Sequence, residues 1–279
     1  MWPFRKNIKL GVAFGGGGAR GFAHVGAIKA FQEYGIEFDF VAGTSAGSIA
    51  GAFYAAGYNY DKILEICKKL DAKEIRNNKF FIMPSKTDGI QKIVKEALGD
   101  IDISELSKPF TAVAVDLKST KEICISKGNL AKAVAGSCAV PGIFQPVEFE
   151  DMLLVDGGLH NNIPSDVVRN MGADVVVAVD VNKYRGGGTE SAKVLDVVSA
   201  SLGILMKESS LKGYLNADIV LKPEMKRFKS SKLEGMEDMI DEGYREAIDQ
   251  IEQILALKSG KIKKAKKKPQ FQEEIIYIK

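Results

Sequence analysis

The sequence predicts an α/β fold built on a mainly parallel central sheet. Short apolar runs at residues 8–14 and 38–42 are each followed by a segment whose apolar residues recur at helical spacing. This strand–helix–strand–helix order is typical of parallel strands joined by right-handed crossovers. The first run ends in glycines, as a buried parallel strand often does.

The remaining elements follow in order along the chain. After the two strands, helices are predicted at 18–34 and 46–56, stopped by Gly35 and Gly57, and a mostly helical pattern at 60–108. Alternating apolar residues predict a hairpin-like pair of strands at 110–117 and 122–126. In the remaining sequence, apolar runs predict strands at 152–155, 174–181 and 218–221, and apolar residues at helical spacing predict helices at 130–138, 167–171 and 236–257.

Composition favours one large domain followed by a basic tail. The chain has 279 residues, 46% of them hydrophobic, which is enough to bury a substantial core. We expect this domain to span residues 1–257. Residues 258–279 hold eight lysines and two glutamates, whereas the whole chain has a net charge of only +3. Such a tail favours either a solvated segment or contact with an anionic membrane.

Cysteine usage and the start of the chain favour a cytoplasmic protein. The three cysteines are scattered without metal-ligand spacing, so we expect free thiols in a reducing compartment and no metal site. The first residues lack the apolar core of a signal peptide, and no apolar run approaches the ~20 residues of a membrane span. The tail lacks interleaved aromatic residues, which argues against nucleic acid as a partner.

Residues 43–47 read Gly-Thr-Ser-Ala-Gly, a G-x-S-x-G pattern between the second strand and a helix. The small residues around Ser45, including Gly43 and Gly47, allow a tight turn that presents its hydroxyl as a nucleophile. A serine that only caps the helix would fit the same position. Ser45 is therefore a candidate catalytic residue.

Four consecutive glycines, Gly15 to Gly18, precede the first helix. Glycines let another group approach the backbone closely, and a helix N-terminus favours negative charge. These N–H groups could form an oxyanion hole. A dinucleotide pyrophosphate site is the alternative, but it requires an acidic residue where the second strand ends in Gly43-Thr44-Ser45.

The sequence offers few groups that could act as the base. Its two histidines are His24, inside the first helix, where we expect a structural role, and His160. His160 follows Asp156, so the order serine, aspartate, histidine of a triad is formally present. Alternatively Asp156 itself, at the end of an apolar strand, is the base if burial raises its pKa. A plain Asp-Gly turn would also explain Asp156.

Together these pieces resemble the patatin-like phospholipase family, whose pattern is G-G-G-x-[RK]-G, G-x-S-x-G and D-G-[GA]. The three motifs stand here at Gly16–Gly21, Gly43–Gly47 and Asp156–Gly158, and the proline-containing stretch 135–146 also looks like that family. The resemblance covers roughly residues 8–221. It implies a three-layer α/β/α fold and a Ser45–Asp156 dyad that needs no histidine, metal or cofactor.

The resemblance also implies roles for the glycines. The amides of Gly16, Gly17 and Gly18 would form the oxyanion hole, and Arg20 would steady their loop. Gly43 and Gly47 would support the serine turn, and Gly157 and Gly158 the turn after the acid.

The expected function is hydrolysis of a lipid or acyl ester by a phospholipase or lysophospholipase type of enzyme. A thioesterase or small-ester esterase would use the same dyad, and a regulatory protein could keep the fold and only bind lipid. Residues 77–84, which include Phe80 and Phe81, are a candidate lid or membrane-touching loop, with a buried turn as the alternative. Trp2, Phe4 and the lysines of 258–268 are further candidates for peripheral membrane contact. The sequence leaves the oligomeric state open.

Overall fold

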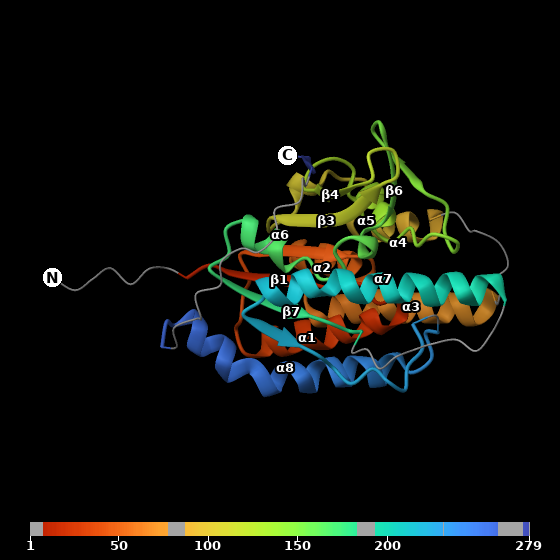
Figure 1. Ribbon diagram of the computed structural model, residues 1–279. Coiled ribbons are helices and arrows are strands. Elements are labelled where there is room, and N and C mark those ends of the chain that lie inside the picture. Colours follow the sequence, from red (N-terminus) through yellow and green to blue (C-terminus); the bar gives the residue numbers. More distant parts are fainter. Residues whose placement is uncertain (1–7, 78–86, 183–192, 231, 262–275, 279) are drawn as a thin grey trace.

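A sheet forms the middle layer of the protein (Figure 1). The computed structural model describes residues 8–77, 87–182, 193–230, 232–261 and 276–278. Within these residues the sheet has the strand order β5-β6-β3-β2-β1-β7-β8, with β4 beside β3 and β9 beside β4. The strands are β1 (Leu10–Phe14), β2 (Phe40–Thr44), β3 (Phe110–Asp116), β4 (Lys121–Ile125), β5 (Val147–Phe149), β6 (Met152–Asp156), β7 (Val175–Val179), β8 (Ile219–Leu221) and β9 (Ile276–Ile278).

The centre of the sheet is parallel and one end is antiparallel. β2, β1, β7 and β8 pair in parallel, and β2 also pairs in parallel with β3. β3 pairs antiparallel with β4 and β6, and β5 forms a hairpin with β6. The mainly parallel sheet and the β3–β4 hairpin expected from the sequence are confirmed.

Strands β2 and β6 meet end to end along one edge of β3. Thr44, the last residue of β2, lies opposite Val113, and Asp156, the last residue of β6, lies opposite Ala114. β4 pairs with the same two residues of β3, so it occupies the other edge. Two strands that run toward each other therefore end at neighbouring positions of the sheet.

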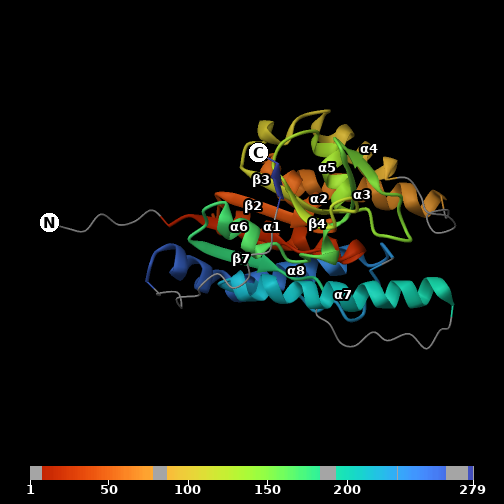
Figure 2. The same cartoon turned by 45° about the horizontal axis from the view of Figure 1, so that its top comes forward.

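Helices cover both faces of the sheet, which gives the three layers (Figures 1 and 2). One face packs against α1 (Phe22–Glu33), α2 (Ala46–Ala55), α5 (Leu130–Ser137) and α8 (Met236–Lys258), with α3 (Tyr60–Asn77) and α4 (Asp88–Leu98) beside them. The other face carries α6 (Ser165–Asn170) and the end of α7 (Val194–Asn216). Short 3-10 turns are η1 (Gly18–Gly21), η2 (Ile103–Glu105) and η3 (Gly157–Leu159).

Alternation along the strands divides the buried side chains into two cores. In β1, Val12 and Phe14 join the larger core under α1, α2 and α8, whereas Ala13 between them faces the smaller core under α6. This period of two is the pattern of a strand that is buried on both faces. The α/β/α fold expected from the family resemblance is thus confirmed.

Helices α1 and α8 pack unusually closely across the larger core. A Cβ on Gly26 of α1 would lie 1.8 Å from the backbone oxygen of Ile240, and a Cβ on Gly243 of α8 would lie 1.9 Å from that of Ala23. Only glycine permits such a backbone approach. This contact joins the last predicted helix firmly to the first.

Three elements were not expected from the sequence: the hairpin strand β5, the long helix α7 and the short strand β9. β9 lies beyond the lysine-rich run and pairs in parallel with β4, where Ser126 Oγ donates to Ile278 O at 2.6 Å. The candidate membrane-contact residues Trp2 and Phe4, the candidate lid apart from Asn77, and most of the lysine-rich run lie outside the described residues. The division of the chain near Lys258 stays a prediction.

Candidate active site

Ser45 occupies the turn between β2 and α2. Its backbone has φ 53° and ψ −128°, a conformation that non-glycine residues rarely adopt. β2 ends at Thr44 and α2 begins at Ala46, so a single residue makes the change of direction. Strain of this kind persists only where the surrounding structure holds it, and it is often found at functional sites.

The glycines on either side of Ser45 are required by space. A Cβ on Gly43 would lie 2.3 Å from the oxygen of Gly47, and a Cβ on Gly47 would lie 2.1 Å from the oxygen of Phe14. A larger residue at Gly43 would push the start of α2 away from β2, and one at Gly47 would push it away from the end of β1. The G-x-S-x-G pattern therefore reflects a close approach of three backbone segments.

Hydrogen bonds fix the backbone of Ser45 on both sides. Its N–H donates to Ser137 Oγ at 2.9 Å, and Ser137 in turn donates to Val113 O at 2.6 Å. Its carbonyl oxygen accepts from the N–H and the Oγ of Ser48, at 2.8 and 2.7 Å. The backbone of the turn is thus satisfied within the protein, which leaves the hydroxyl for chemistry.

The glycine loop passes directly over this turn. A Cβ on Gly16 would lie 3.2 Å from Ser45 Cβ. A Cβ on Gly17 would lie 2.3 Å from Val181, and one on Gly18 would lie 2.4 Å from the oxygen of Ser230. Gly18 also has φ +57°, which favours glycine. These contacts hold the loop beside the serine, while Gly17 stays half-buried and Gly18 exposed.

The amides of the glycine loop differ in how they are used. The N–H of Gly16 donates to Asn162 O at 3.0 Å, so the fold already occupies it. The N–H groups of Gly17 and Gly18, at the start of η1, donate to no other group in the described part of the chain. These two amides are the ones available to a negatively charged oxygen.

Arg20 anchors the loop from behind. Its Nε donates to Phe228 O at 3.0 Å, and its Nη1 donates to Asn182 Oδ1 at 3.1 Å. Asn182 then donates through Nδ2 to Gly16 O at 2.7 Å. Arg20 therefore reaches the glycine loop through Asn182.

Asp156 ends β6 and caps η3, where no part of it is exposed to solvent. Its Oδ1 accepts from the N–H of Gly158 at 2.8 Å, while Oδ2 has no hydrogen-bond partner among the described residues. Burial raises the pKa of Asp156 to about 6, and the nearby Ser45 hydroxyl and the N–H of Gly158 oppose that rise. Ser45 thus lies near the carboxyl without completing a hydrogen bond to Oδ2.

Neither histidine is hydrogen-bonded to Asp156. His24 is fully buried in α1, where its Nε2–H donates to Gly15 O at 2.8 Å. Burial lowers the pKa of His24 to about 4, so the ring is neutral and braces the glycine loop. His160 is exposed beyond η3, whereas Asp156 is buried. The structure therefore does not assemble the serine–aspartate–histidine arrangement.

Asn162 connects the acid turn to the glycine loop and was not singled out in the sequence. Its backbone oxygen holds Gly16, and its Nδ2 donates to Ser210 Oγ at 3.2 Å. Its buried Oδ1 has no partner in the described part of the chain and lies within 3.1 Å of the position that a Cβ on Gly158 would take. The sequence signal that could have identified Asn162 is the Asn161-Asn162 pair shortly after the Asp-Gly-Gly motif.

A buried ionic network supports the preceding residue, Asn161. Its Nδ2 donates to Glu122 Oε1 at 2.9 Å and to Asp166 Oδ1 at 2.8 Å, and Lys212 Nζ bridges the other oxygens of both carboxylates at 2.9 Å each. The backbone oxygen of Asn161 accepts from Thr44 Oγ1 at 2.8 Å. The network thus joins β4, α6 and α7 to the serine turn.

Cys138 is a third buried group beside the two candidate catalytic residues. Burial raises the pKa of its thiol, the charge of Asp156 raises it further, and Ser48 and Ser45 lower it. Ala139, the next residue, accepts a hydrogen bond from the N–H of Asp156 at 3.0 Å. The proline-containing stretch after α5 therefore forms one wall of the site.

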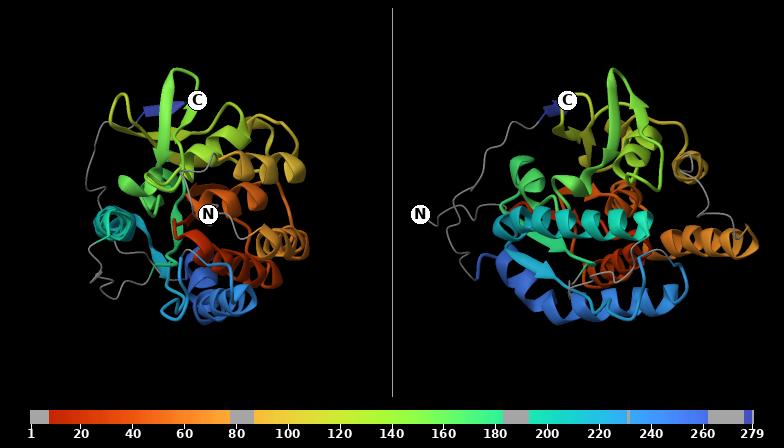
Figure 3. Two further views of the ribbon diagram at one scale, coloured as in Figure 1. Left: turned by 90° about the vertical axis from the view of Figure 1, so that its right-hand side faces the viewer. Right: turned by 45° about the vertical axis from the view of Figure 1, so that its right-hand side comes forward.

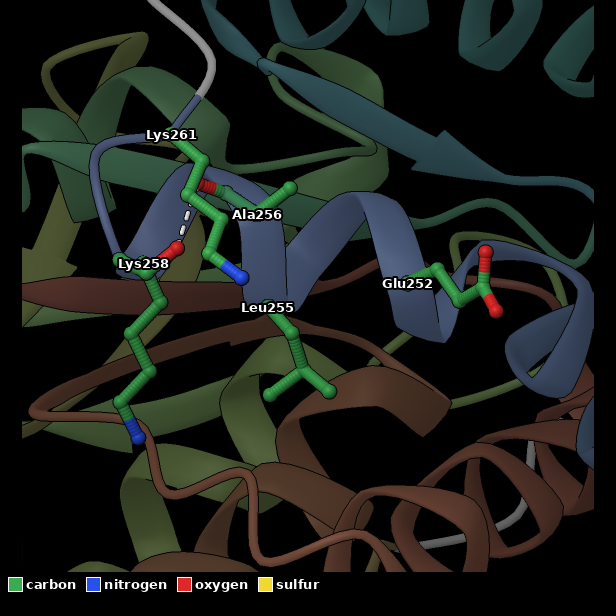
Figure 4. Close-up of a pocket in the computed structure, with 6 residues that line it drawn as sticks. Glu252, Leu255, Ala256, Lys258 and Lys261 are labelled. Carbon is green, nitrogen blue, oxygen red and sulfur yellow. Dashed lines mark hydrogen bonds between the residues drawn. The ribbon is translucent and has the colours of Figure 1, made fainter.

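A separate hollow lies at the C-terminal end of α8, where Lys261 N donates to Ala256 O at 3.0 Å (Figure 4). It is lined by Glu252, Leu255, Ala256, Lys258, Ser259 and Lys261, none of which belongs to the candidate site. Within the described residues, no group of three His, Cys, Asp or Glu side chains is placed to hold a metal ion. No helix in the described ranges is long and apolar enough to cross a membrane.

Comparison with known proteins relates the chain to one family. The family model described as patatin-like phospholipase matches residues 12–169, which include the serine turn, the glycine loop and the acid turn. An uncharacterized NTE family protein of Mycobacterium tuberculosis is 33% identical over 192 residues, which are 66% of this chain and 52% of that protein. The neuropathy target esterase sws of Drosophila melanogaster is 32% identical over 184 residues, 62% of this chain and 13% of that protein.

The chain thus spans about half the length of the mycobacterial relative. Among solved structures, VipD from Legionella pneumophila superposes with a TM-score of 0.63 at 15% identity, covering 88% of this chain and 67% of VipD. At this identity the likeness concerns the fold. It covers a larger share of this chain than the family model, which matches residues 12–169.

Proposed function

The chain belongs to the patatin-like phospholipase family, and from this premise we propose that it is a lipid acyl hydrolase with Ser45 as nucleophile and Asp156 as base. The substrates we propose are phospholipids, lysophospholipids or simpler acyl esters. The family match supports lipid hydrolysis in general, and the geometry around Ser45 supports the assignment of residues.

The observation that carries the proposal is the state of Asp156. A fully buried carboxyl with one oxygen unpaired is unfavourable, and natural proteins rarely keep such a group without a use. With a pKa of about 6 it is ionised at neutral pH, yet it is a much better base than an exposed aspartate. Ser45, the neighbouring hydroxyl, is the proton donor that this base would serve.

In the first half of the proposed reaction, Ser45 Oγ attacks the ester carbonyl carbon and its proton passes to Asp156 Oδ2. The carbonyl oxygen becomes negatively charged and accepts hydrogen bonds from the N–H groups of Gly17 and Gly18. We assign the oxyanion hole to these two amides, because the N–H of Gly16 is already bonded to Asn162. The intermediate then collapses, the leaving alcohol takes the proton from Asp156, and an acyl-Ser45 ester remains.

In the second half, a water molecule attacks the acyl carbonyl carbon and gives its proton to Asp156. The same two amides hold the second oxyanion. When this intermediate collapses, Ser45 Oγ leaves as the alcohol, its proton comes from Asp156, and the fatty acid is released. The same carboxyl therefore acts as base and acid in turn, and no histidine takes part.

The test is hydrolysis of a medium-chain p-nitrophenyl ester and of a phospholipid by four proteins: wild type, Ser45→Ala, Asp156→Asn and His160→Ala. We expect Ser45→Ala and Asp156→Asn to lose at least about a thousandfold in turnover, because each removes a member of a unit that acts together. His160→Ala should keep wild-type activity, since His160 is exposed and the carboxyl of Asp156 is buried.

Loss of activity in a folded His160→Ala protein would replace the dyad by a triad. If wild type cleaves neither substrate but binds lipid, the chain is a binding protein that keeps the fold. Cleavage of a thioester in preference to both oxygen esters would move the proposal to a thioesterase with the same residues.

A further inference from the structure

Helix α7 presents an apolar face to solvent along its first half. Val194 is 76% exposed, Ile204 64% and Leu205 53%, and Val197 and Val198 are also exposed. We call these five residues the α7 apolar face. Their spacing of 3, 4, 10 and 11 positions from Val194 places them on one side of a helix, over about 17 Å of its length.

This face is unlike the rest of the described surface. Other exposed large apolar side chains outside α7 are scattered, as at Tyr34, Leu117 and Leu255. Scattered apolar residues are ordinary on a protein surface, whereas a contiguous apolar stripe marks a surface that meets something else. Figure 2 shows the first turns of α7 projecting past the sheet, and Figure 3 shows the helix along one side of the molecule.

The α7 apolar face runs directly into the candidate active site. On the next turn of the helix, Ser209 Oγ donates to Gly158 O at 2.7 Å. The methyl carbon of Met206 lies 3.1 Å from the position that a Cβ on Gly158 would take. Gly158 in turn donates its N–H to Asp156. The helix that carries the exposed stripe is thus bonded to the turn that holds the proposed base.

A second apolar segment lies beside the face. Val198 lies 3.7 Å from the position of a Cβ on Gly142, in the stretch between α5 and β5. In that stretch Val140, Ile143 and Phe144 are half-buried. The same stretch begins just after Ala139, which accepts the N–H of Asp156. The α7 apolar face and the stretch after α5 are therefore neighbours, and each adjoins in sequence a residue that contacts the acid turn.

We propose that the α7 apolar face rests on the surface of a phospholipid bilayer and holds the candidate active site against it. The inference depends on the proposed lipid hydrolase function, and it adds the surface through which the enzyme meets its substrate. A bilayer at this face puts phospholipid beside the acid turn, where the reaction needs it. Lys193 precedes the stripe in sequence, and the exposed pair Lys207 and Glu208 follows it, so the membrane contact we propose is apolar and does not depend on anionic head groups.

The first experiment measures co-sedimentation of the full chain with vesicles of phosphatidylcholine, with and without phosphatidylglycerol. The variant Ile204→Ser/Leu205→Ser should lose roughly tenfold in vesicle affinity, because two aliphatic side chains no longer enter the interface. Val194→Ser/Val197→Ser should show a similar loss. Leu255→Ser is the matched control, because α8 ends at the opposite end of the molecule from the start of α7 (Figure 1), and its affinity should not change.

A second experiment locates the contact directly. All three native cysteines are buried, and burial raises the pKa of Cys67 to about 12, so they react slowly with thiol reagents. A polarity-sensitive dye on Ile204→Cys should shift to the blue on addition of vesicles. The same dye on Leu255→Cys should not shift.

Hydrolysis of a water-soluble ester separates this inference from the proposed function. The Ile204→Ser/Leu205→Ser variant should keep wild-type turnover of that ester and lose activity only on vesicles. Unchanged vesicle binding in this variant would overturn the inference, as would a dimer of the wild type that the variant dissociates, because a second copy would then cover the face. If wild type binds vesicles through α7 but hydrolyses nothing, the proposed function fails and the bilayer contact stands.

Discussion

Thr44 and Asp156 end strands that run toward each other along the same edge of β3, and they lie opposite its consecutive residues Val113 and Ala114. Backbone pairing therefore places the residue before the proposed nucleophile next to the proposed base. A parallel strand and an antiparallel strand that end at one point of a sheet bring a serine turn and an acid turn together without a long loop. The two groups are thus positioned by the most rigid part of the fold.

The first prediction concerns the pH dependence of activity. Because the base must be ionised and the pKa of Asp156 is about 6, kcat/KM for a soluble ester should rise about tenfold per pH unit below 6 and level off above it. Steady-state kinetics across this range measure the profile. A histidine titrates in the same range, so His160→Ala is the control and should keep the same midpoint. A shifted midpoint in that variant would assign the titration to His160.

The second prediction concerns stability. Asp156 binds its proton more tightly in the folded state than in the unfolded chain, so its contribution to stability is greatest at low pH and falls as pH rises from about 4 to 6. Asp156→Asn removes this penalty and should raise the free energy of unfolding at pH 8 by about 3 kcal/mol. Urea denaturation at pH 8 and pH 4 measures the difference, which should nearly vanish at pH 4. An Asn variant that is less stable than wild type at pH 8 would contradict the destabilising effect of the buried carboxylate charge.

The third prediction concerns the glycine loop and has a matched control within the chain. Gly18 and Gly35 have nearly the same φ, +57° and +62°, so alanine at either one carries a similar backbone penalty. Only at Gly18 does the new Cβ meet a neighbour, the oxygen of Ser230, because Gly35 has nothing within 4 Å. Gly18→Ala should reduce kcat about a hundredfold, whereas Gly35→Ala should leave it unchanged. Equal kcat values for the two variants would show that the glycine loop takes no part in the reaction.

The fourth prediction concerns the ionic network behind the site. Lys212→Met leaves Glu122 and Asp166 buried without a counter-charge and should destabilise the protein by about 3–5 kcal/mol. Lys207→Met, on the exposed side of the same helix, is the control and should change little. Adding Glu122→Gln to the Lys212→Met variant should restore part of the stability in chemical denaturation. No rescue would mean that Lys212 acts through packing and not through charge.

Much of the fold could be predicted because its central strands follow simple patterns. β1, β2 and β7 are short apolar runs, and the glycine-rich turns after β1 and β2 mark their ends. Helix α7 was missed because apolar residues lie on several sides of it, so its helical periodicity is weak, and Gly203 interrupts it. β5 and β9 have three residues each and so carry little alternation, although β8, which is as short, was predicted.

The candidate site was predictable only in part. Ser45 and Asp156 belong to short motifs, so the sequence identifies them, but their meeting depends on how β2 and β6 share one edge of β3. Asn162 carries no motif of its own, and its role comes from a backbone oxygen that any residue has. The hydrogen bond of the Gly16 N–H could not be foreseen either, because its acceptor is the backbone oxygen of Asn162.

Covalent labelling tests the central claim most directly, because it reports on the nucleophile and the base in one assay. A fluorophosphonate reacts with a serine only when its hydroxyl is activated. Peptide mass spectrometry of the labelled protein at pH 8 should find the adduct on Ser45 in wild type and in His160→Ala. Asp156→Asn should label at least about a thousandfold more slowly, and Ser45→Ala not at all. Labelling of Asp156→Asn at the wild-type rate, or an adduct on another serine, would contradict the account.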